Sequence, residues 1–443
     1  MDATFAYAWY GDDFTGASDT LATVAQSGLR TILFCGVPSS AQFRAAGPLD
    51  AFGIAGAGRS MAPDAMRAEL AEVASFLAPS GVRVLHYKCC STFDSAPHVG
   101  SIGVAVDALR GLAPDNPVFV VGGQPSLGRY CVFGELHAVA QLGGPVYRID
   151  RHPTMSRHPV TPMNEADLRV HLSRQGLRDI GLVDYRSHEH AGGFHAALDD
   201  FDGRRDDETA QRVVLLDVSE PAQLKTIGAA IRKRAHRAPL LAVGASSVAQ
   251  ALIEHARLPR FALDGAIAPA HGPVLVIAGS LSPVTARQIG QAALYDRMPL
   301  DARRLATERD YLRDEAARIV DRLRAGRHVL AHTSPVEHGR SSQPGEVSSQ
   351  VAPASAALLA TVLRAIELKR VGIAGGDTSS HAVQALGAWG LEWMGRIDAG
   401  VPLLRARADA PSVAGLELML KGGQMGGDGL FDVLVSGSAA PAN

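Results

Sequence analysis

The chain has 443 residues, of which 47% are hydrophobic, 5% aromatic and 20% charged, and its formal net charge is −2. This apolar fraction indicates a folded protein, and the length suggests two or three domains at about 150 residues each. The balance of 43 basic against 45 acidic residues lacks the basic excess of a nucleic-acid-binding protein. No apolar run approaches the ~20 residues of a membrane span. We therefore expect a soluble multi-domain protein with neither a nucleic-acid nor a membrane partner.

The cysteines and the N-terminus bear on the cellular compartment. Cys35, Cys89, Cys90 and Cys131 form no C-x-x-C pair and no spacing typical of a metal site or a disulfide framework. The first residues lack the basic start and long apolar core of a secretory signal. These features predict reduced thiols and a cytoplasmic location.

Short runs rich in Val, Ile and Leu recur along the chain, and many are followed by a small polar cluster and then a helical pattern. Because the runs lack polar alternation, they predict strands buried on both faces. In chain order these strands are Phe5–Tyr10, Thr31–Phe34, Ala51–Ala55, Val82–Tyr87, Pro117–Val121, Gly181–Asp184, Val213–Val218, Leu240–Val243, Pro273–Ala278, His328–Ala331, Arg370–Ile373 and Gly415–Leu420. Predicted helices between them include Ser18–Ser27, Met61–Ala78, Leu224–Ala235 and Pro283–Ala293. The alternation predicts an α/β fold of largely parallel sheets flanked by helices.

A boundary between two domains is expected near the middle of the chain. The segment Arg257–Gly272 contains two prolines and two glycines and precedes a strong strand–loop–helix pattern. We therefore predict an N-terminal domain over residues 1–256, a crossing segment over 257–272 and a C-terminal domain over 273–443. Because ligands of open α/β sheets bind beyond the carboxyl ends of the strands, the loops at those ends are the candidate sites.

Two such loops in the first half carry charged side chains. Asp12 and Asp13 follow the first strand and are placed to bind polyol hydroxyls, to coordinate a cation or to accept a proton, although Asp13 could equally cap the next helix. Lys88 and Asp94 follow the strand Val82–Tyr87. The lysine could pair with a carboxylate or phosphate, or be an exposed residue at a strand end.

Three glycine- or serine-bearing loops in the second half favour a nucleotide. Ser282 precedes a proline-initiated helix, whose free N–H groups attract anions, although plain helix capping explains the same residues. The loop Gly375–Ser379 permits close approach of the backbone to a phosphate, and Lys421–Gly427 is a second glycine-rich loop, or a flexible turn. Neither a Walker loop nor G-x-G-x-x-G occurs at these strand ends.

Taken together, these loops resemble the motifs of the four-carbon acid sugar kinase family, whose members phosphorylate acids such as threonate, erythronate and 3-oxo-tetronate with ATP. The matching segments are Asp12–Ala17, Cys90–Ser95, His158–Met163, Gly279–Thr285, Gly375–Thr378 and Lys421–Gly423. The chain departs from the family pattern at Asp377, where members usually have Glu, at Ser101, where they usually have Asn, and over Gln124–Arg157.

The resemblance implies that the N-terminal domain binds the sugar acid and the C-terminal domain binds ATP with Mg²⁺. It places Asp12, Asp13, Lys88, Ser91 and Asp94 at the sugar acid and Ser282, Gly375, Gly376, Asp377, Thr378 and Gly423 at the nucleotide. Asp12, Asp13 and Asp377 are the candidate catalytic residues. Either of the first two could accept the proton of the reacting hydroxyl, Lys88 would neutralise the substrate carboxylate, and Asp377 suits Mg²⁺ or the γ-phosphate.

The predicted activity is therefore ATP-dependent phosphorylation of a hydroxyl of a small sugar acid, and a homodimer is compatible with the sequence. Two alternatives stay open. One is an NAD-dependent oxidoreductase acting on a small hydroxy acid, although its glycine fingerprint is missing. The other is a sensor that binds a sugar acid without turning it over.

Overall fold

The computed structural model describes residues 6–140, 143–158, 160–203, 212–256, 266–279, 282–333, 344–398, 400–423 and 425–438. The chain forms two compact units, one of residues 1–30 and 48–260 and the other of residues 31–47 and 261–443. The predicted division at residues 257–272 stays a proposal, since residues 257–265 lie outside the described ranges. The grouping of Thr31–Gly47 with the second unit has no counterpart in the sequence pattern.

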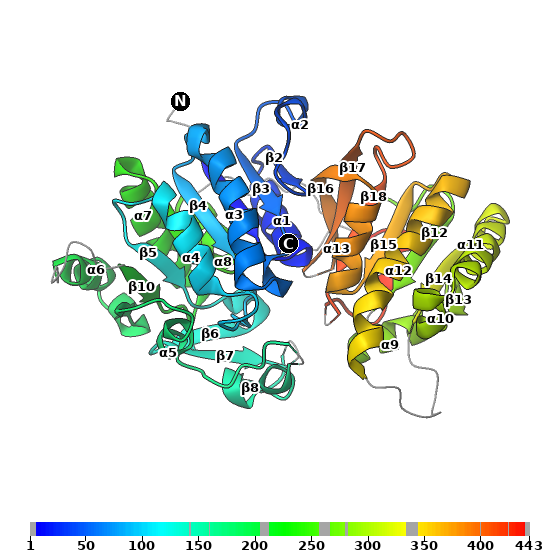
Figure 1. Cartoon of the computed structure of the whole chain (residues 1–443). Coiled ribbons are helices and arrows are strands. Elements are labelled where there is room, and N and C mark those ends of the chain that lie inside the picture. Colours follow the sequence, from blue (N-terminus) through cyan, green and yellow to red (C-terminus); the bar gives the residue numbers. More distant parts are fainter. Residues whose placement is uncertain are drawn as a thin grey trace. The chain divides into compact units, whose positions relative to one another are not determined.

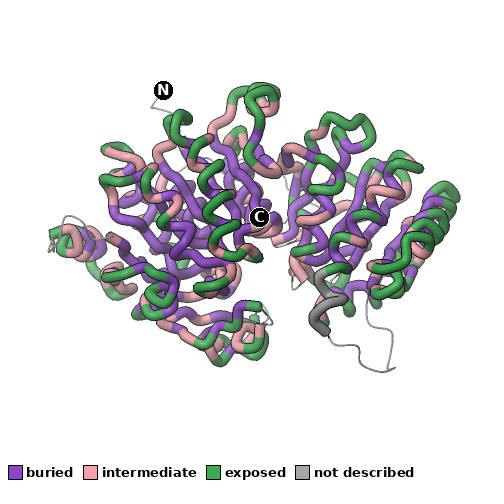
Figure 2. The backbone as a smooth tube through the Cα atoms, viewed as in Figure 1, coloured by how far each residue is buried: buried purple, intermediate pink, exposed green. Residues whose placement is uncertain are grey.

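The first unit is built around a parallel sheet (Figure 1). Its strand order is β3-β1-β4-β11-β5-β10-β9, and every pairing in this sheet is parallel. The strands are β1 (Tyr7–Gly11), β3 (Ala51–Ala55), β4 (Val84–Lys88), β5 (Val118–Val121), β9 (Ile180–Val183), β10 (Val213–Leu216) and β11 (Leu240–Gly244). Almost every residue of the central strands is buried, as the unbroken apolar runs predicted (Figure 2).

Helices flank the sheet of the first unit. They are α1 (Phe14–Ala25), α3 (Pro63–Leu77), α4 (Ile102–Leu109), α5 (Leu168–Ser173), α6 (Gly193–Gly203), α7 (Pro221–Arg237) and α8 (Ser247–Ala256). Contacts pair α3 with α4, and join α8 to both α1 and α7. A separate antiparallel sheet, β6 (Arg129–Val132), β7 (Glu135–Val139) and β8 (Val146–Arg148), follows β5 and was not predicted.

The second unit has a mixed sheet in the order β13-β14-β12-β15-β18-β17-β16-β2. Its parallel part comprises β12 (Val274–Ala278), β13 (Tyr295–Pro299), β14 (His328–His332), β15 (Arg370–Ala374) and β18 (Glu417–Lys421). Its antiparallel part comprises β17 (Val401–Ala408), β16 (Ala388–Asp398) and β2 (Thr31–Phe34). Thr31–Phe34, which the sequence pattern assigns to the largely parallel sheets, pairs with the antiparallel strand β16.

Helices of the second unit complete the α/β arrangement. They are α2 (Ser40–Ala45), α9 (Pro283–Gln291), α10 (Ala302–Thr307), α11 (Arg309–Arg324), α12 (Pro344–Ala365), α13 (Gly376–Ala385) and α14 (Leu430–Ser436). Helices α10 to α13 pack against one another, and α9 packs against α14. No helix in the described ranges combines the length and apolar character needed to cross a membrane. The predicted fold class, α/β with largely parallel sheets and flanking helices, is confirmed.

Candidate active site

The charged loops of the first unit meet at the point where its strand order reverses. From β1 the chain moves to β3 on one side, and the next strand, β4, lies on the other side of β1. Gly11 at the end of β1 is in register with Lys88 at the end of β4. Asp12, Asp13 and Lys88 therefore lie together at a topological switch point, where α/β sheets bind their ligands.

Asp13 is fixed by two different partners. As the N-cap of α1, its Oδ1 accepts a hydrogen bond from the Gly16 amide at 2.5 Å, and its Oδ2 pairs with Arg59 Nη1 at 2.8 Å. Burial opposes ionisation of Asp13, but the charges of Lys88 and Arg59 outweigh it and lower the pKa of this carboxyl. The sequence left open whether Asp13 caps the helix or belongs to a binding site. The structure shows that it caps α1 and also belongs to the charged cluster.

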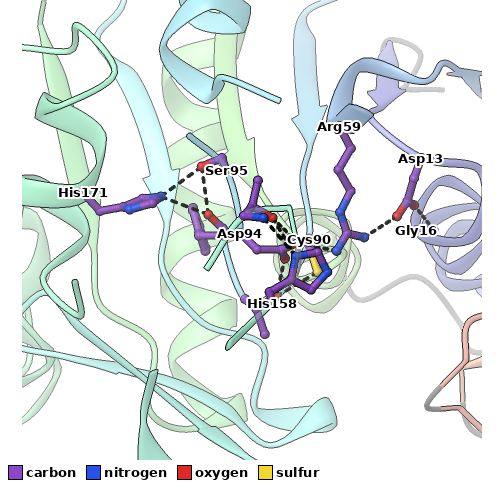
Figure 3. Close-up of polar contacts among 11 residues, drawn as sticks. Asp13, Gly16, Arg59, Cys90, Asp94, Ser95, His158 and His171 are labelled. Atoms are coloured by element: carbon purple, nitrogen blue, oxygen red, sulfur yellow. Dashed lines mark hydrogen bonds and ion pairs between the residues drawn. The ribbon is translucent and has the colours of Figure 1, made fainter. Parts of the chain in front are cut away.

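Arg59 links the two acidic loops of this cluster (Figure 3). It lies in a short 3₁₀ turn, Gly58–Ser60, after β3, and its Nη2 pairs with Asp94 while its Nη1 pairs with Asp13. Asp94 is fully buried and also accepts from Thr92 Oγ1 at 2.5 Å and Thr161 Oγ1 at 3.4 Å. Burial opposes ionisation of Asp94, but the charge of Arg59 and the hydrogen bond from Thr92 lower the pKa of this carboxyl.

Sequence reasoning missed Arg59. The usable signal was its position, because it follows the predicted strand Ala51–Ala55 and precedes a helix that begins with Pro63. Its backbone amide donates to the carbonyl of Asp12 at 3.1 Å, which ties the loops after β1 and β3 together.

Asp12 differs sharply from its neighbour. It is 3% exposed, and its Oδ1 is buried without a hydrogen-bond partner in the described part of the chain. Burial and the adjacent charge of Asp13 raise its pKa from 3.8 to about 7, against the opposing effect of Lys88 and Arg59. The structure thus holds two adjacent aspartates in different states, one ionised and tied, the other poised to exchange a proton near neutral pH.

Lys88 lies under the N-terminus of α1. A Cβ at Gly16 would lie 1.8 Å from Lys88 Nζ, so only glycine leaves room for the ammonium. The lysine is 5% exposed, and no carboxylate oxygen of the described residues lies within the 4.0 Å of an ion pair. Burial disfavours its charge, but Asp13 and Asp12 offset this and raise its pKa. Ser91, half-buried in the same loop, makes no side-chain hydrogen bond to the described residues.

The glycine loops of the second unit also meet at a switch point. The chain leaves β12 for β13 on one side, while β15 lies on the other side and pairs Ala374 with Ala278 of β12. Gly279 follows β12, and a Cβ there would lie 2.4 Å from Thr378 Oγ1. Gly375 follows β15 with φ +125°, a conformation that L side chains rarely adopt. At these two strand ends, Gly279 and Gly375 leave the backbone without a side chain, and at Gly279 there is no room for one.

Two helices, α9 and α13, begin at this edge of the sheet, and the free N–H groups of a helix N-terminus attract anions. Gly375 caps α13, and Gly376 is half-buried in its first turn while Thr378 is buried. Ser282 caps α9 by accepting from the Val284 amide at 3.2 Å, as its position before Pro283 predicted. Ser280 and Leu281 of the predicted loop, like Gln424 of the last glycine loop, lie outside the described residues.

Lys421 underlies the last glycine loop. It is fully buried at the end of β18, and its Nζ donates to Thr285 Oγ1 at 2.9 Å and to the Gly423 carbonyl at 3.4 Å. Thr285 in turn donates to the same carbonyl at 3.0 Å. Burial lowers the pKa of Lys421 to about 8, because no carboxylate of the described residues pairs with it. A buried cation beneath a glycine loop is suited to an anionic ligand.

Asp377 is exposed in the first turn of α13. Within the described ranges, no group of three or more His, Cys, Asp or Glu side chains could hold a metal ion. Mg²⁺ in phosphoryl-transfer enzymes takes only one or two carboxylates, together with phosphate oxygens and water. A single exposed carboxylate beside the bare backbone of Gly375 fits that mode of binding.

Comparisons with known proteins identify the family of the chain. Residues 7–252 match a family described as a sugar-binding N-terminal domain, and residues 275–431 match one described as a nucleotide-binding C-terminal domain. The 3-oxo-isoapionate kinase of Paraburkholderia graminis is 36% identical over 98% of this chain and 95% of its own length. The chain belongs to the four-carbon acid sugar kinase family. The family predicted from the sequence motifs is thereby confirmed.

One more curated relative and two solved structures cover almost the whole length of the chain. The 3-oxo-tetronate kinase of Methylobacterium radiotolerans is 32% identical over 95% of this chain and 96% of its own. A crystal structure from Salmonella typhimurium LT2 has a TM-score of 0.78 at 23% identity, and covers 97% of this chain and 98% of its own. A Haemophilus influenzae structure has a TM-score of 0.70 at 23% identity, with 96% and 98% covered. These two structures share the fold.

Proposed function

We propose that this kinase transfers the γ-phosphoryl group of ATP to a hydroxyl of a small 3-oxo sugar acid, with Asp12 as the general base. Phosphotransfer to a sugar acid is the reaction class of its family. The observation that carries the rest is the contrast at the switch point of the first unit. There the buried Asp12, whose Oδ1 has no hydrogen-bond partner among the described residues, adjoins Asp13, which is ion-paired with Arg59.

The choice of Asp12 over Asp13 rests on their hydrogen bonds. Both oxygens of Asp13 already accept a hydrogen bond, from Gly16 and Arg59, and its lowered pKa makes it a poor proton acceptor. Asp12 has a free Oδ1, and its pKa lies close to neutral pH, where a general base is most effective. In the reaction, the substrate hydroxyl oxygen bonds to the γ-phosphorus, its proton passes to Asp12, and the bond from that phosphorus to the β,γ-bridging oxygen breaks to release ADP.

The remaining residues of the first unit are proposed to hold the acid. Lys88, Ser91 and Asp94 line the same strand ends as Asp12, and Arg59 keeps Asp13 and Asp94 ionised and in place. Because Asp13 and Asp94 are fixed acceptors, they suit substrate hydroxyl groups.

The second unit is proposed to hold ATP at the ends of β12, β15 and β18. Ser282, Gly375, Gly376, Thr378 and Gly423 would contact the nucleotide, and Asp377 would hold Mg²⁺. When bound, Mg²⁺ would neutralise the charge that develops on the transferred phosphoryl group. The buried charge of Lys421 lies beneath the same loops and would favour the triphosphate.

A coupled ADP-release assay tests the proposal. The panel should contain 3-oxo-tetronate, 3-oxo-isoapionate, threonate and erythronate, each with ATP and Mg²⁺, and turnover is expected with the 3-oxo acids. Turnover of threonate or erythronate alone would reject the 3-oxo specificity. Binding of the acids without ADP release would favour a sensor, and binding of NADH without ADP release would favour an oxidoreductase.

A second test addresses the nucleotide site. Gly376→Val places a branched side chain in the first turn of α13, where the phosphates would approach the backbone. ATP affinity measured by calorimetry should fall strongly, while sugar-acid affinity should change little. Unchanged ATP affinity in the folded variant would refute this placement.

A further inference from the structure

Arg129 is a half-buried cation in the first unit, and no carboxylate of the described residues pairs with it. It begins β6, its Nη1 donates to the Leu127 carbonyl, and its Nε is buried without any hydrogen-bond partner among the described residues. No carboxylate oxygen of those residues lies within 4.0 Å of its guanidinium. Burial disfavours the charge and lowers the pKa of Arg129, and the neighbouring Cys90 and Tyr130 do not reverse this.

The position of Arg129 brings it to the edge of the sheet that carries the candidate active site. Its backbone pairs in both directions with Gln124, in the loop after β5. The Gln124 side chain reaches Asp19 Oδ2 in α1 at 3.5 Å, and Ser246, just after β11, donates to the same oxygen at 2.5 Å. The loops after β5 and β11 and the second turn of α1 are thus joined beside Arg129.

Hydrogen bonds attach the strand that carries Arg129 to the end of β10. The Cys131 amide donates to the carbonyl of Val218 at 2.8 Å, after β10. Asp217, also at that strand end, accepts from the amides of Phe133 and Gly134 at 2.5 and 3.0 Å. These contacts hold the β6–β7 hairpin on the sheet, so the guanidinium is presented by a preorganised element.

Arg129 differs from the other two cations at this edge. Arg59 is paired with both Asp13 and Asp94. The ammonium of Lys88 has no ion pair, but Asp13 and Asp12 are close enough to raise its pKa. Neither an ion pair nor a nearby carboxylate offsets the charge of Arg129. A partly buried cation with no carboxylate nearby is costly unless an anion joins it. Lys88 already has Asp12 and Asp13 nearby, so a missing anion is expected at Arg129 rather than at Lys88.

We propose that Arg129 binds the carboxylate of the sugar acid. The inference rests on the proposed function, because it is the substrate of that reaction that supplies the carboxylate. A guanidinium suits this role, since its fork of N–H donors matches the two oxygens of a carboxylate. Lys88, expected from the sequence to neutralise the carboxylate, is then left beside Asp12, at the reacting hydroxyl.

The test compares the sugar acid with its carboxamide, which has the same shape without the charge. Dissociation constants for both, and for ATP, are measured by calorimetry on the wild-type chain and on Arg129→Met. The variant should bind the acid about 10- to 100-fold more weakly, as expected for loss of a charge-assisted pair. Its affinities for the carboxamide and for ATP should stay within about twofold, so the preference for the acid should collapse.

Two further variants make the result decisive. Arg148→Met is the matched control, because Arg148 lies in β8 of the same small sheet but is paired with Asp150, and it should keep the wild-type preference. Arg129→Lys keeps the charge without the fork and should give an intermediate loss, which tests the proposal even if the Met variant fails to fold.

Other outcomes identify which idea has failed. An unchanged preference for the acid in folded Arg129 variants would overturn the assignment, and its collapse in Lys88→Met alone would move the carboxylate to Lys88. If the wild-type chain phosphorylates no sugar acid in the panel, the proposed function itself is wrong, whatever the Arg129 variants do.

Discussion

Replacing Asp12 by Asn should make the protein more stable while removing its activity. The carboxyl is ordinarily half-ionised at pH 3.8, and its pKa in the fold is about 7. Ionising it there at higher pH therefore costs about 4 kcal/mol, at about 1.4 kcal/mol per pH unit. Asn keeps the shape without the charge, so the free energy of unfolding at pH 8 should rise by up to that amount.

The sign and pH window of this effect follow from proton linkage. Below pH 3.8 the carboxyl is protonated in both the folded and unfolded chains, and the substitution should have little effect on stability. Between pH 3.8 and about 7 only the unfolded chain loses the proton, so the wild type loses stability as pH rises. Urea denaturation should show the advantage of Asp12→Asn growing through this range and levelling off above it.

Whereas the stability of the wild type should fall as pH rises, its catalytic activity should rise. A general base must be ionised, so kcat/KM of the wild type should rise with pH and level off above about 7, by the ADP-release assay. Asp12→Asn should lower kcat about 10²- to 10⁴-fold, roughly preserve affinity for the acid, and lose this pH dependence.

Asp13→Asn serves as the comparison. Asn is also a good N-cap, but it loses the ion pair with Arg59. Because the pKa of Asp13 is lowered in the fold, its stabilising contribution is present above pH 3.8 and is lost as pH falls through the folded value. This variant should therefore be less stable at pH 8, opposite to Asp12→Asn. Near-normal turnover in Asp12→Asn would refute the assignment of the base, and near-normal turnover in both Asn variants would make Asp377 the next candidate.

Three further predictions concern the residues around the two sites. Arg59→Gln should leave Asp13 and Asp94 without their shared cation, so the affinity for the sugar acid measured by calorimetry should fall about tenfold or more; unchanged affinity would show that Arg59 is dispensable. Gly375→Ala forces a side chain onto a backbone at φ +125°, and the KM for ATP should rise while that for the acid stays near the wild-type value. Lys421 has a pKa of about 8, so ATP affinity should weaken as pH rises through that value, and Lys421→Met should abolish this dependence; a persisting dependence would assign it to another group.

The sequence by itself determined many of the buried strands and the loops that hold the candidate site residues. Unbroken apolar runs such as Ala51–Ala55 and Leu240–Val243 became buried parallel strands, because burial on both faces excludes charged and polar side chains. Once the strands are located, the polar loops that follow them can be located from the order of residues in the chain. The strands of the small β6–β8 sheet, with partly exposed and polar residues, carry no such signal and were missed.

Only the tertiary structure decided which charged groups meet and how they share protons. Adjacent in sequence, Asp12 and Asp13 cannot be told apart until burial and the partners from other strands are known. Arg59 matters because β3 lies beside β1, and Arg129 because Gln124 and Asp217 fix its hairpin on the ends of distant strands. Desolvation and Coulomb interactions depend on distances in space, and distances between residues far apart in the chain are set by the fold.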